Sequence, residues 1–209
     1  IGSIDTKQSS ASVTLDTGDK DTMNSNFESA DAFSVSLGSE ITKYLNLELA
    51  LQKNMKSESN NMAYSRNGTP NTTGTYMSSV QTNSIMISAL VDIAEVTNNN
   101  WLVKPYLGLG LGLAQNKIDG MKNVLNNSSV FYEVGKETTY NFAHKYILGL
   151  TYDITKEVVL DLSYSIADYG DAKASPNYTT STSSGIQNDA FHFDSIKTRE
   201  SFISLRYKF

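Results

Sequence analysis

Apolar and polar residues alternate along this chain with a period of two. The segment YLNLELALQ places four leucines at alternate positions, Leu45, Leu47, Leu49 and Leu51. The same pattern recurs in six further segments: 32–40, 81–93, 101–115, 139–153, 158–168 and 201–209. Successive side chains of a β-strand point to opposite faces, so the alternation predicts strands with one apolar face. An eighth strand is expected within residues 1–15, where Val13 and Leu15 carry the pattern.

The connections between these segments alternate between short and long. Three are short, near residues 39–42, 95–100 and 153–157. Four are long and rich in Asn, Ser, Thr, Gly and Asp: about 16–31, 54–79, 117–139 and 170–194. A soluble sandwich gives no reason for this alternation, whereas outer-membrane barrels have short periplasmic turns and long extracellular loops. The chain is therefore predicted to be all-β. We expect one domain over 1–209: an eight-stranded antiparallel up-and-down transmembrane β-barrel with four long extracellular loops, three short periplasmic turns and both termini periplasmic.

The composition of the two strand faces indicates which one points outward. The segment WLVKPYLGLGLGLAQ sets leucines on one face and Gly108, Gly110 and Gly112 on the other. A soluble surface would favour Lys and Glu at the glycine positions, but small residues suit the narrow interior of a small barrel. The apolar face is therefore expected to contact lipid. Aromatic residues fall near the strand ends, as in interfacial girdles: Trp101, Tyr140, Phe142, Tyr152, Tyr207 and Phe209.

Bulk composition limits the partners of the chain. The 209 residues carry a net charge of −5, so nucleic acid is not an expected partner. There is no cysteine, which excludes disulfides and thiolate metal sites. No apolar run reaches the ~18 residues of a spanning helix, and mean hydropathy is −0.32. No signal peptide is evident at Ile1, so an exported chain either begins here after its cleavage site or has been trimmed.

The C-terminal segment SFISLRYKF resembles the signal by which bacterial outer-membrane barrels are recognised for insertion. Leu205, Tyr207 and Phe209 match its alternating hydrophobic residues and terminal Phe, while Ser204 and Phe202 depart from it. This resemblance implies the barrel-assembly machinery as a partner, and outer-membrane lipid and lipopolysaccharide as surroundings. KPYLGLGLGLAQNKI and YILGLTYDITKEVVLDLSYSIADYG are similar to strands of the OmpA/Opa-like surface antigens, and the layout matches over about 32–209. The composition also resembles rickettsial-type surface antigens, which implies an adhesin-like role.

Seven charged residues are expected to project into the barrel interior, where unpaired charge is costly. They are Glu48, Asp92, Lys104, Lys145, Asp161, Glu200 and Arg206. Opposite charges should pair there and close the lumen as a salt-bridged plug. The alternatives are a gated pore whose gate is these pairs, or a titratable catalytic site.

The sequence offers little for catalysis, cofactor binding or metal binding. A serine hydrolase needs a His base beside its Ser, and His192 lies near Asp194 and Ser195. Neighbours on a strand point to opposite faces, so we expect no catalytic site and a protein that is not an enzyme. His144 falls on the lipid-facing side of its strand, unless a local bulge shifts the register. No cofactor or metal site is expected from two isolated histidines.

The long loops amount to roughly 90 residues, which exceeds what linking strands requires. Candidate contact residues within them are Met62, Tyr64, Phe131, Tyr132 and Tyr178. Such side chains either anchor a partner or pack the loops on one another, and the sequence leaves both open. The leading hypothesis is an adhesin-like surface protein that binds a host or environmental macromolecule, such as a host surface or matrix protein. The alternatives are a narrow channel for ions or small solutes and a purely structural membrane barrel.

Overall fold

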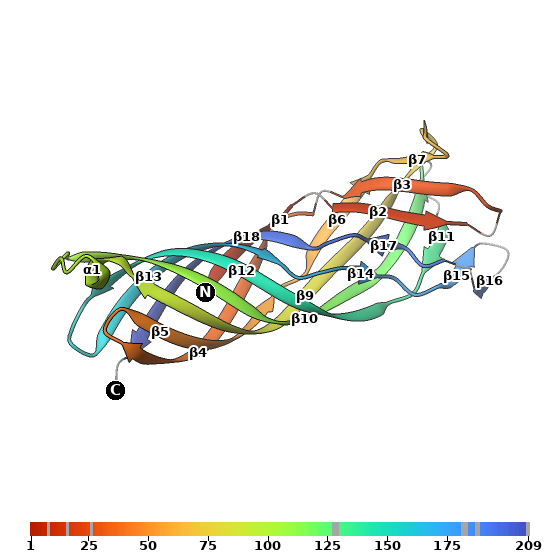
Figure 1. The fold of residues 1–209 in the computed structure, drawn as a ribbon. Coiled ribbons are helices and arrows are strands. Elements are labelled where there is room, and N and C mark those ends of the chain that lie inside the picture. The colour runs from red at the N-terminus through yellow and green to blue at the C-terminus, as the bar shows by residue number, and fades with distance from the viewer. Residues whose placement is uncertain are drawn as a thin grey trace.

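Eight strands form a closed antiparallel ring. The computed structural model describes residues 1–7, 9–15, 17–25, 27–126, 130–180, 184–186 and 189–207. The ring strands, in order, are β1 (Gly2–Thr6), β4 (Ala30–Thr42), β5 (Leu45–Asn54), β9 (Gly74–Asp92), β10 (Val103–Leu125), β12 (Glu137–Asp153), β13 (Val158–Asp168) and β18 (Lys197–Tyr207). Strand β18 pairs with β1 and closes the ring (Figure 1). The predicted eight-stranded up-and-down barrel is confirmed.

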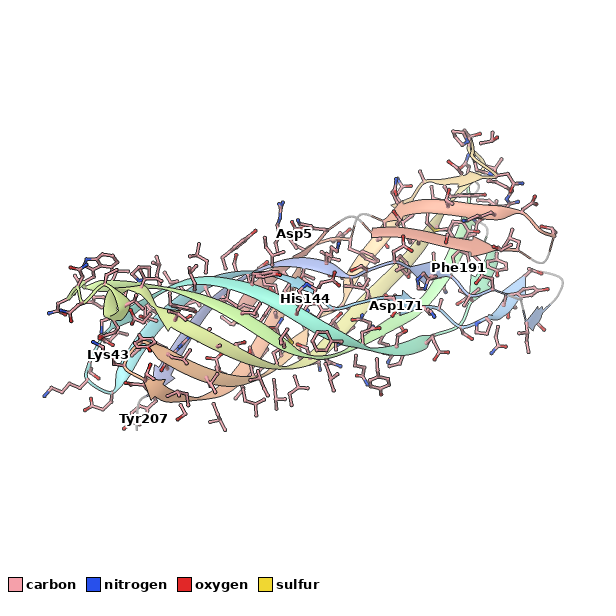
Figure 2. The ribbon with its side chains drawn as sticks, viewed as in Figure 1. Asp5, Lys43, His144, Asp171, Phe191 and Tyr207 are labelled. Carbon is pink, nitrogen blue, oxygen red and sulfur yellow. The ribbon has the colours of Figure 1, made fainter. Side chains whose placement is uncertain are left out.

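Three short connections lie at one end of the barrel, here called the turn end. Lys43 and Tyr44 join β4 to β5, and residues 154–157 join β12 to β13. The third connection contains α1 (Ile93–Val96), a single turn of four residues. No helix in the described part of the chain is long and apolar enough to cross a membrane. Tyr207 lies at the turn end (Figure 2), whereas the Ile1 amino group donates to the carbonyl of Ile203, partway along the wall.

The four segments predicted as long loops are mostly β-structure, which corrects that part of the prediction. They contain β3 (Lys20–Ser25), β6 (Ser57–Met62), β7 (Tyr64–Arg66), β8 (Thr69–Pro70), β11 (Val130–Val134), β14 (Ala172–Lys173), β15 (Asn177–Thr180), β16 (Ser184–Ile186) and β17 (His192–Phe193). A further short strand, β2 (Ser9–Thr14), lies just before the first of these segments. A second sheet has the order β14-β17-β2-β3-β7-β8. All ten of these short strands, in both sheets, form what we call the distal extension, together with the far ends of β9 and β10 (Figure 1).

The first barrel strand lies within residues 1–15, as predicted, but the residues expected to mark it belong to another strand. Val13 and Leu15 were expected to mark the first barrel strand, but Val13 lies in β2 of the second sheet and is fully buried. The barrel strand is β1, whose residues Gly2 and Ile4 pair with Phe202 and Glu200. Alternation alone could not separate the two, because a strand of the distal extension has the same period as one in the membrane.

The distal extension has a hydrophobic core, which continues into the adjoining part of the barrel interior at Met86 and Ala143. Tyr76, Tyr169, Phe191 and Phe193 are among its largest buried side chains, each at most 2% exposed. Tyr76 contacts both Tyr64 and Phe191, with ring centroids 4.9 and 5.2 Å apart. This core joins both sheets, so the extension is a packed unit rather than a set of separate loops.

In the barrel, the apolar face points outward. The exposed large hydrophobic side chains include Val35, Leu37, Leu49, Leu51, Ile85, Ile87, Leu107, Leu109, Leu111, Leu113, Tyr146, Leu148, Leu150, Leu162, Ile166, Ile203 and Leu205. Trp101, Tyr152 and Tyr207 are exposed near the turn end, and Tyr140 and Phe142 at the other edge of this band. The inner face is correspondingly small: a Cβ on Gly149 would overlap the Tyr106 ring, which lies across the lumen wall there.

A polar row ends the apolar band on four adjacent strands. Lys53 pairs in register with Asn83, which in turn pairs with Gln115. Asn83 Nδ2 donates to Gln115 Oε1 at 3.0 Å, and Gln115 Nε2 donates to the Tyr140 hydroxyl at 2.8 Å. On its strand, each of these outward groups lies two residues from the last apolar residue of the band, which is Leu51, Ile85, Leu113 or Phe142. The row marks where the wall leaves the hydrocarbon region, because polar side chains there can reach the interface.

A β-bulge on β10 reverses its faces beyond this row. The register with β9 shifts between Ile118 and Met121, and Gly120 has φ +89°, which favours glycine. Before the bulge, odd-numbered residues such as Leu113 point outward; after it, Met121 and Asn123 are buried. The bulge therefore turns one run of alternating residues from the membrane surface into the distal core.

Candidate functional site

The charged network at the turn end of the lumen centres on Arg206. Its Nη2 atom lies 2.7 Å from Asp161 Oδ2 and 3.7 Å from Glu48 Oε2. The same nitrogen donates to the Tyr106 hydroxyl at 3.3 Å, and that hydroxyl donates to Asp161 Oδ1 at 3.2 Å. The side chain of Asp161 is only 3% exposed, so this is a buried pair whose two members depend on each other.

Apolar side chains fill the lumen beside this network. Leu90, Tyr106 and Ile147 form a buried cluster on the inner face. The Arg206 guanidinium lies 5.4 Å from the centre of the Tyr106 ring. Together with the ion pairs, these side chains make the turn end a packed plug.

Two of the predicted interior charges, Asp92 and Lys104, have partners other than Arg206. Asp92 caps α1, where its Oδ1 accepts from the backbone N–H groups of Ala94 and Glu95 at 2.8 and 3.1 Å. Lys104 pairs with Asp153 at 3.0 Å on the partly exposed rim. Asp153 was not predicted, because it was read as part of a turn.

The other two predicted charges, Glu200 and Lys145, have no charged partner among the described residues. Glu200 is fully buried, and Tyr169, Thr198 and Gln52 all donate to its Oε1 atom, at 2.6, 3.0 and 3.1 Å. Ser165 donates to Oε2 at 3.2 Å. Lys145 is 8% exposed and makes no ion pair with any described residue. The expectation that interior charges pair was therefore wrong for these two, since neutral hydroxyl and amide donors satisfy Glu200.

The predicted loop contacts are mostly interior residues of the distal extension. Met62, Tyr64 and Tyr132 are 1, 6 and 8% exposed. Tyr178 is half-buried and stacks on Tyr132, with centroids 5.5 Å apart. Of the two alternatives left open by the sequence, packing of the segments on one another holds for these four. The side chain of Phe131 lies outside the described ones.

A pocket of about 280 Å³ opens into the distal extension. It is lined by Leu15, Tyr64, Arg66, Asn71, Thr73, Tyr76, Asn123, Leu125 and Tyr132. Asn123 is 3% exposed, and its Nδ2 atom has no hydrogen-bond partner among the described residues. Sequence reasoning named Tyr64 and Tyr132 but missed Arg66, Tyr76 and Asn123. The bulge at Gly120, which turns Asn123 inward, has no clear sequence signal.

A buried carboxylate holds one wall of this pocket. Arg66 Nε and Nη2 donate to Asp21 Oδ1 and Oδ2 at 2.8 and 2.9 Å, and the Tyr76 hydroxyl donates to Oδ2 at 3.0 Å. Asp21 is fully buried. The hydrogen bond to Asp21 raises the pKa of Arg66, and burial together with Asp21 raises the pKa of Tyr76. Both groups therefore keep their protons over the physiological range, and the charges of Arg66 and Asp21 cancel.

An ion-pair cluster fastens the outside of the distal extension. Lys56 lies 2.7 Å from Asp119, and Lys136 pairs with the other oxygen of the same carboxylate. Hydrogen bonds from Lys136 and Lys56 lower the pKa of Asp119 from 3.8 to about 2. The cluster joins three segments that are distant in sequence.

The structure places both histidines beside described groups. His192 Nδ1 and Nε2 lie 3.7 and 3.9 Å from Asp171 and Asp194, while the Ser195 hydroxyl donates to Asp168 at 2.7 Å. His144 pairs in register with Leu111 in an unshifted ladder, so it faces outward and no bulge displaces it. No group of three or more potential metal ligands occurs among the described residues.

The insertion signal is described up to Tyr207. Leu205 and Tyr207 are 72 and 62% exposed on the outer face, and Phe209 lies outside the described residues. A groove of about 670 Å³ lies on the same outer surface, lined by Leu148, Leu150, Leu162, Tyr164 and Ile203, among others. It belongs to the surface that faces lipid.

Comparison with known proteins agrees with this geometry. Among solved structures, OprG from Pseudomonas aeruginosa is 16% identical, with a TM-score of 0.57 over 100% of this chain and 91% of that one. The outer membrane protease OmpT from Escherichia coli is 8% identical, with a TM-score of 0.54 over 100% and 95%. Ail, the attachment invasion locus protein of Yersinia pestis, is 13% identical, with a TM-score of 0.40 over 100% and 97%.

These likenesses concern the fold alone. No curated protein sequence matches the chain. The model of the outer membrane protein beta-barrel domain family matches residues 3–209. With its closed ring, outward apolar band and filled lumen, the chain belongs to the outer membrane protein beta-barrel domain family and is a bacterial outer-membrane β-barrel protein.

Proposed function

We propose that this protein is a non-enzymatic surface protein that binds a host or environmental macromolecule through its distal extension. The observation that carries the proposal is the extension itself, a second sheet with its own aromatic core. Closing a barrel needs only short connections, so this mass of ordered structure requires another purpose. In this proposal the distal extension is extracellular and the turn end is periplasmic, as is usual for barrels with short and long connections.

The proposal extends to the surroundings of the barrel. The exposed leucines contact outer-membrane lipid and lipopolysaccharide, and the barrel-assembly machinery recognises Leu205, Tyr207 and Phe209 of the C-terminal segment. The protein is an OmpA/Opa-like surface antigen in this view. A host surface or matrix protein remains the expected class of macromolecular partner, and nucleic acid does not, given the negative net charge.

The packed lumen argues against the alternative of a channel. Tyr106, Leu90 and Ile147 fill the turn end, and Arg206 holds Asp161 and Glu48 beside them. A solute would have to displace these side chains and separate buried charges. Planar-bilayer recordings are therefore expected to show no conductance above the background.

Adhesion of cells that display the protein tests the main proposal. The comparison is between the intact chain and a barrel-only variant in which segments 9–28, 56–79, 119–136 and 171–195 are replaced by short Asn-Gly turns. A heat-modifiability gel verifies that both are folded. We expect the intact protein to confer adhesion to host cells or matrix-coated plates and the variant to confer none. Equal adhesion by both would contradict the proposal and favour a purely structural barrel.

A further inference from the structure

We propose that the pocket in the distal extension binds a neutral sugar residue, such as a terminal hexose or N-acetylhexosamine. This inference rests on the proposed function and assigns a ligand class to the same extracellular surface. It starts from a combination of features that packing does not require: a hollow, three tyrosine rings and an unpartnered amide in one place.

The unpartnered amide is the most informative of these features. Asn123 is 3% exposed, and its Nδ2 donor has no partner among the described residues, although buried polar groups are almost always paired. Leaving such a donor unpaired destabilises a fold, and an apolar residue of the same shape would remove that cost. A ligand oxygen that accepts from Nδ2 explains why an amide stands at this position.

The tyrosines supply a rigid aromatic wall. Tyr76 is fixed between Tyr64 and Phe191, and Tyr132 is fixed by stacking on Tyr178. A pyranose ring has an apolar face of C–H groups that suits an aromatic surface, and hydroxyl groups at its edge that suit amides. Because the rings are already packed, a ligand would not have to order them on binding.

The charges around the pocket favour an uncharged ligand. Among the described residues of the lining, Arg66 is the only cation, and its charge is neutralised by the bidentate contact with Asp21. Asp21 leaves some guanidinium N–H groups of Arg66 available as donors to hydroxyls. An anionic sugar would gain little from a cation that is already paired.

The size of the pocket matches one sugar ring. Its volume of about 280 Å³ is just below the range of about 300–1,000 Å³ that is usual for small-molecule sites. The pocket therefore fits the terminal residue of a glycan, and the rest of the glycan would extend into solvent.

The test uses the full-length protein in detergent micelles on an array of neutral and sialylated oligosaccharides, followed by titration with the methyl glycoside of the best neutral residue. Three variants are compared with the wild type. Asn123→Leu removes the donor, Leu125→Trp fills the pocket, and Ile186→Trp places the same bulk on an exposed site of β16 outside it. Melting temperature is measured for all of them.

We expect saturable binding of a neutral glycan by the wild type and by Ile186→Trp. Asn123→Leu should weaken binding by about tenfold, the loss of one hydrogen bond, while its melting temperature stays equal or rises. Leu125→Trp should abolish binding. A purely structural role for Asn123 would instead lower the melting temperature of Asn123→Leu.

The results separate this inference from the proposed function. Adhesion without any binding of neutral glycans, or adhesion that Leu125→Trp leaves unchanged, would overturn the sugar pocket and leave the surface role standing. Binding of sialylated glycans alone would overturn the neutral-ligand assignment. Variant-sensitive glycan binding by a protein that confers no adhesion would support the pocket and overturn the adhesin-like role.

Discussion

The barrel and the distal extension share the strands β9 and β10, but their interiors differ in polarity. In the barrel, Leu109 and Leu111 point outward, and the lumen holds charged side chains, hydroxyl groups and glycines. In the extension, Phe191 and Phe193 are fully buried and lysines such as Lys122 lie on the surface. The difference follows from the solvent, because lipid covers one outer surface and water the other. A large apolar side chain on the outer wall of the barrel therefore needs no burial, whereas most of those in the extension lie inside it.

Truncating a large aromatic side chain should show the largest difference in stability between the two regions. Phe191→Ala empties a position in the distal core, so we expect a loss of about 3–5 kcal/mol in the free energy of unfolding of the extension. Phe142→Ala, on the lipid-facing band, removes contacts that lipid replaces and should cost much less. Urea titration followed by limited proteolysis measures both, and equal effects would contradict the inversion.

Separating the buried charges is the next largest effect expected. Arg206→Leu leaves Asp161 and Glu48 without their cation in the lumen, which should lower stability by about 3 kcal/mol. The double variant Arg206→Leu with Asp161→Leu should recover part of that loss, because it removes the stranded carboxylate. Unfolding in detergent or lipid vesicles measures both variants, and a double variant no more stable than the single one would argue against the pair.

The membrane boundary at the polar row can be tested by placing a charge in the apolar band and another in the row itself. Leu109→Lys puts a charge in the middle of the apolar band and should cost about 2–4 kcal/mol, as for midplane lysines in other barrels. Gln115→Lys sits in the row itself and should cost about 0–1 kcal/mol. Folding into vesicles measures each. Equal costs would show that the membrane boundary lies elsewhere.

The smallest effect expected is a pH dependence of the distal extension. Because Lys136 and Lys56 lower the pKa of Asp119 to about 2, the carboxylate adds stability above its unfolded pKa of 3.8. That contribution, about 0.5 kcal/mol for a surface cluster, should be lost as pH falls from about 4 to 2. Melting temperature against pH measures it, and Asp119→Asn should show a flatter profile between those values.

Much of the barrel could be predicted from the sequence because lipid contact imposes a local rule. Each outward position on a strand must be apolar, so Leu107 to Leu113 identify their strand without reference to any other. The Arg206–Asp161 pair could be anticipated because strand direction places both residues in one half of the lumen. Glu200 could not, since its partners come from Tyr169, Gln52 and Ser165, which only the closed ring brings together.

The distal extension was mostly beyond sequence reasoning. Its strands are short and contain many Ser, Thr and Asn residues, so they resemble loops by composition. The inward turn of Asn123 depends on the bulge at Gly120, a single backbone feature. The pocket combines residues from four separate stretches of the chain, and no local sequence pattern predicts that they lie together.

Strand β10 runs continuously from the barrel to the pocket, so its length sets the distance of the pocket from the membrane. Gln115 lies in the row that ends the apolar band, and Leu125 lines the pocket ten residues further along the same strand. At about 3.3 Å per residue and a tilt of about 40°, this run would raise the pocket roughly 25 Å from the hydrocarbon edge. The polar headgroup layer is only about 6 Å thick on each side. The barrel thus acts as a stiff pedestal, and the pocket can meet an object that never approaches the bilayer.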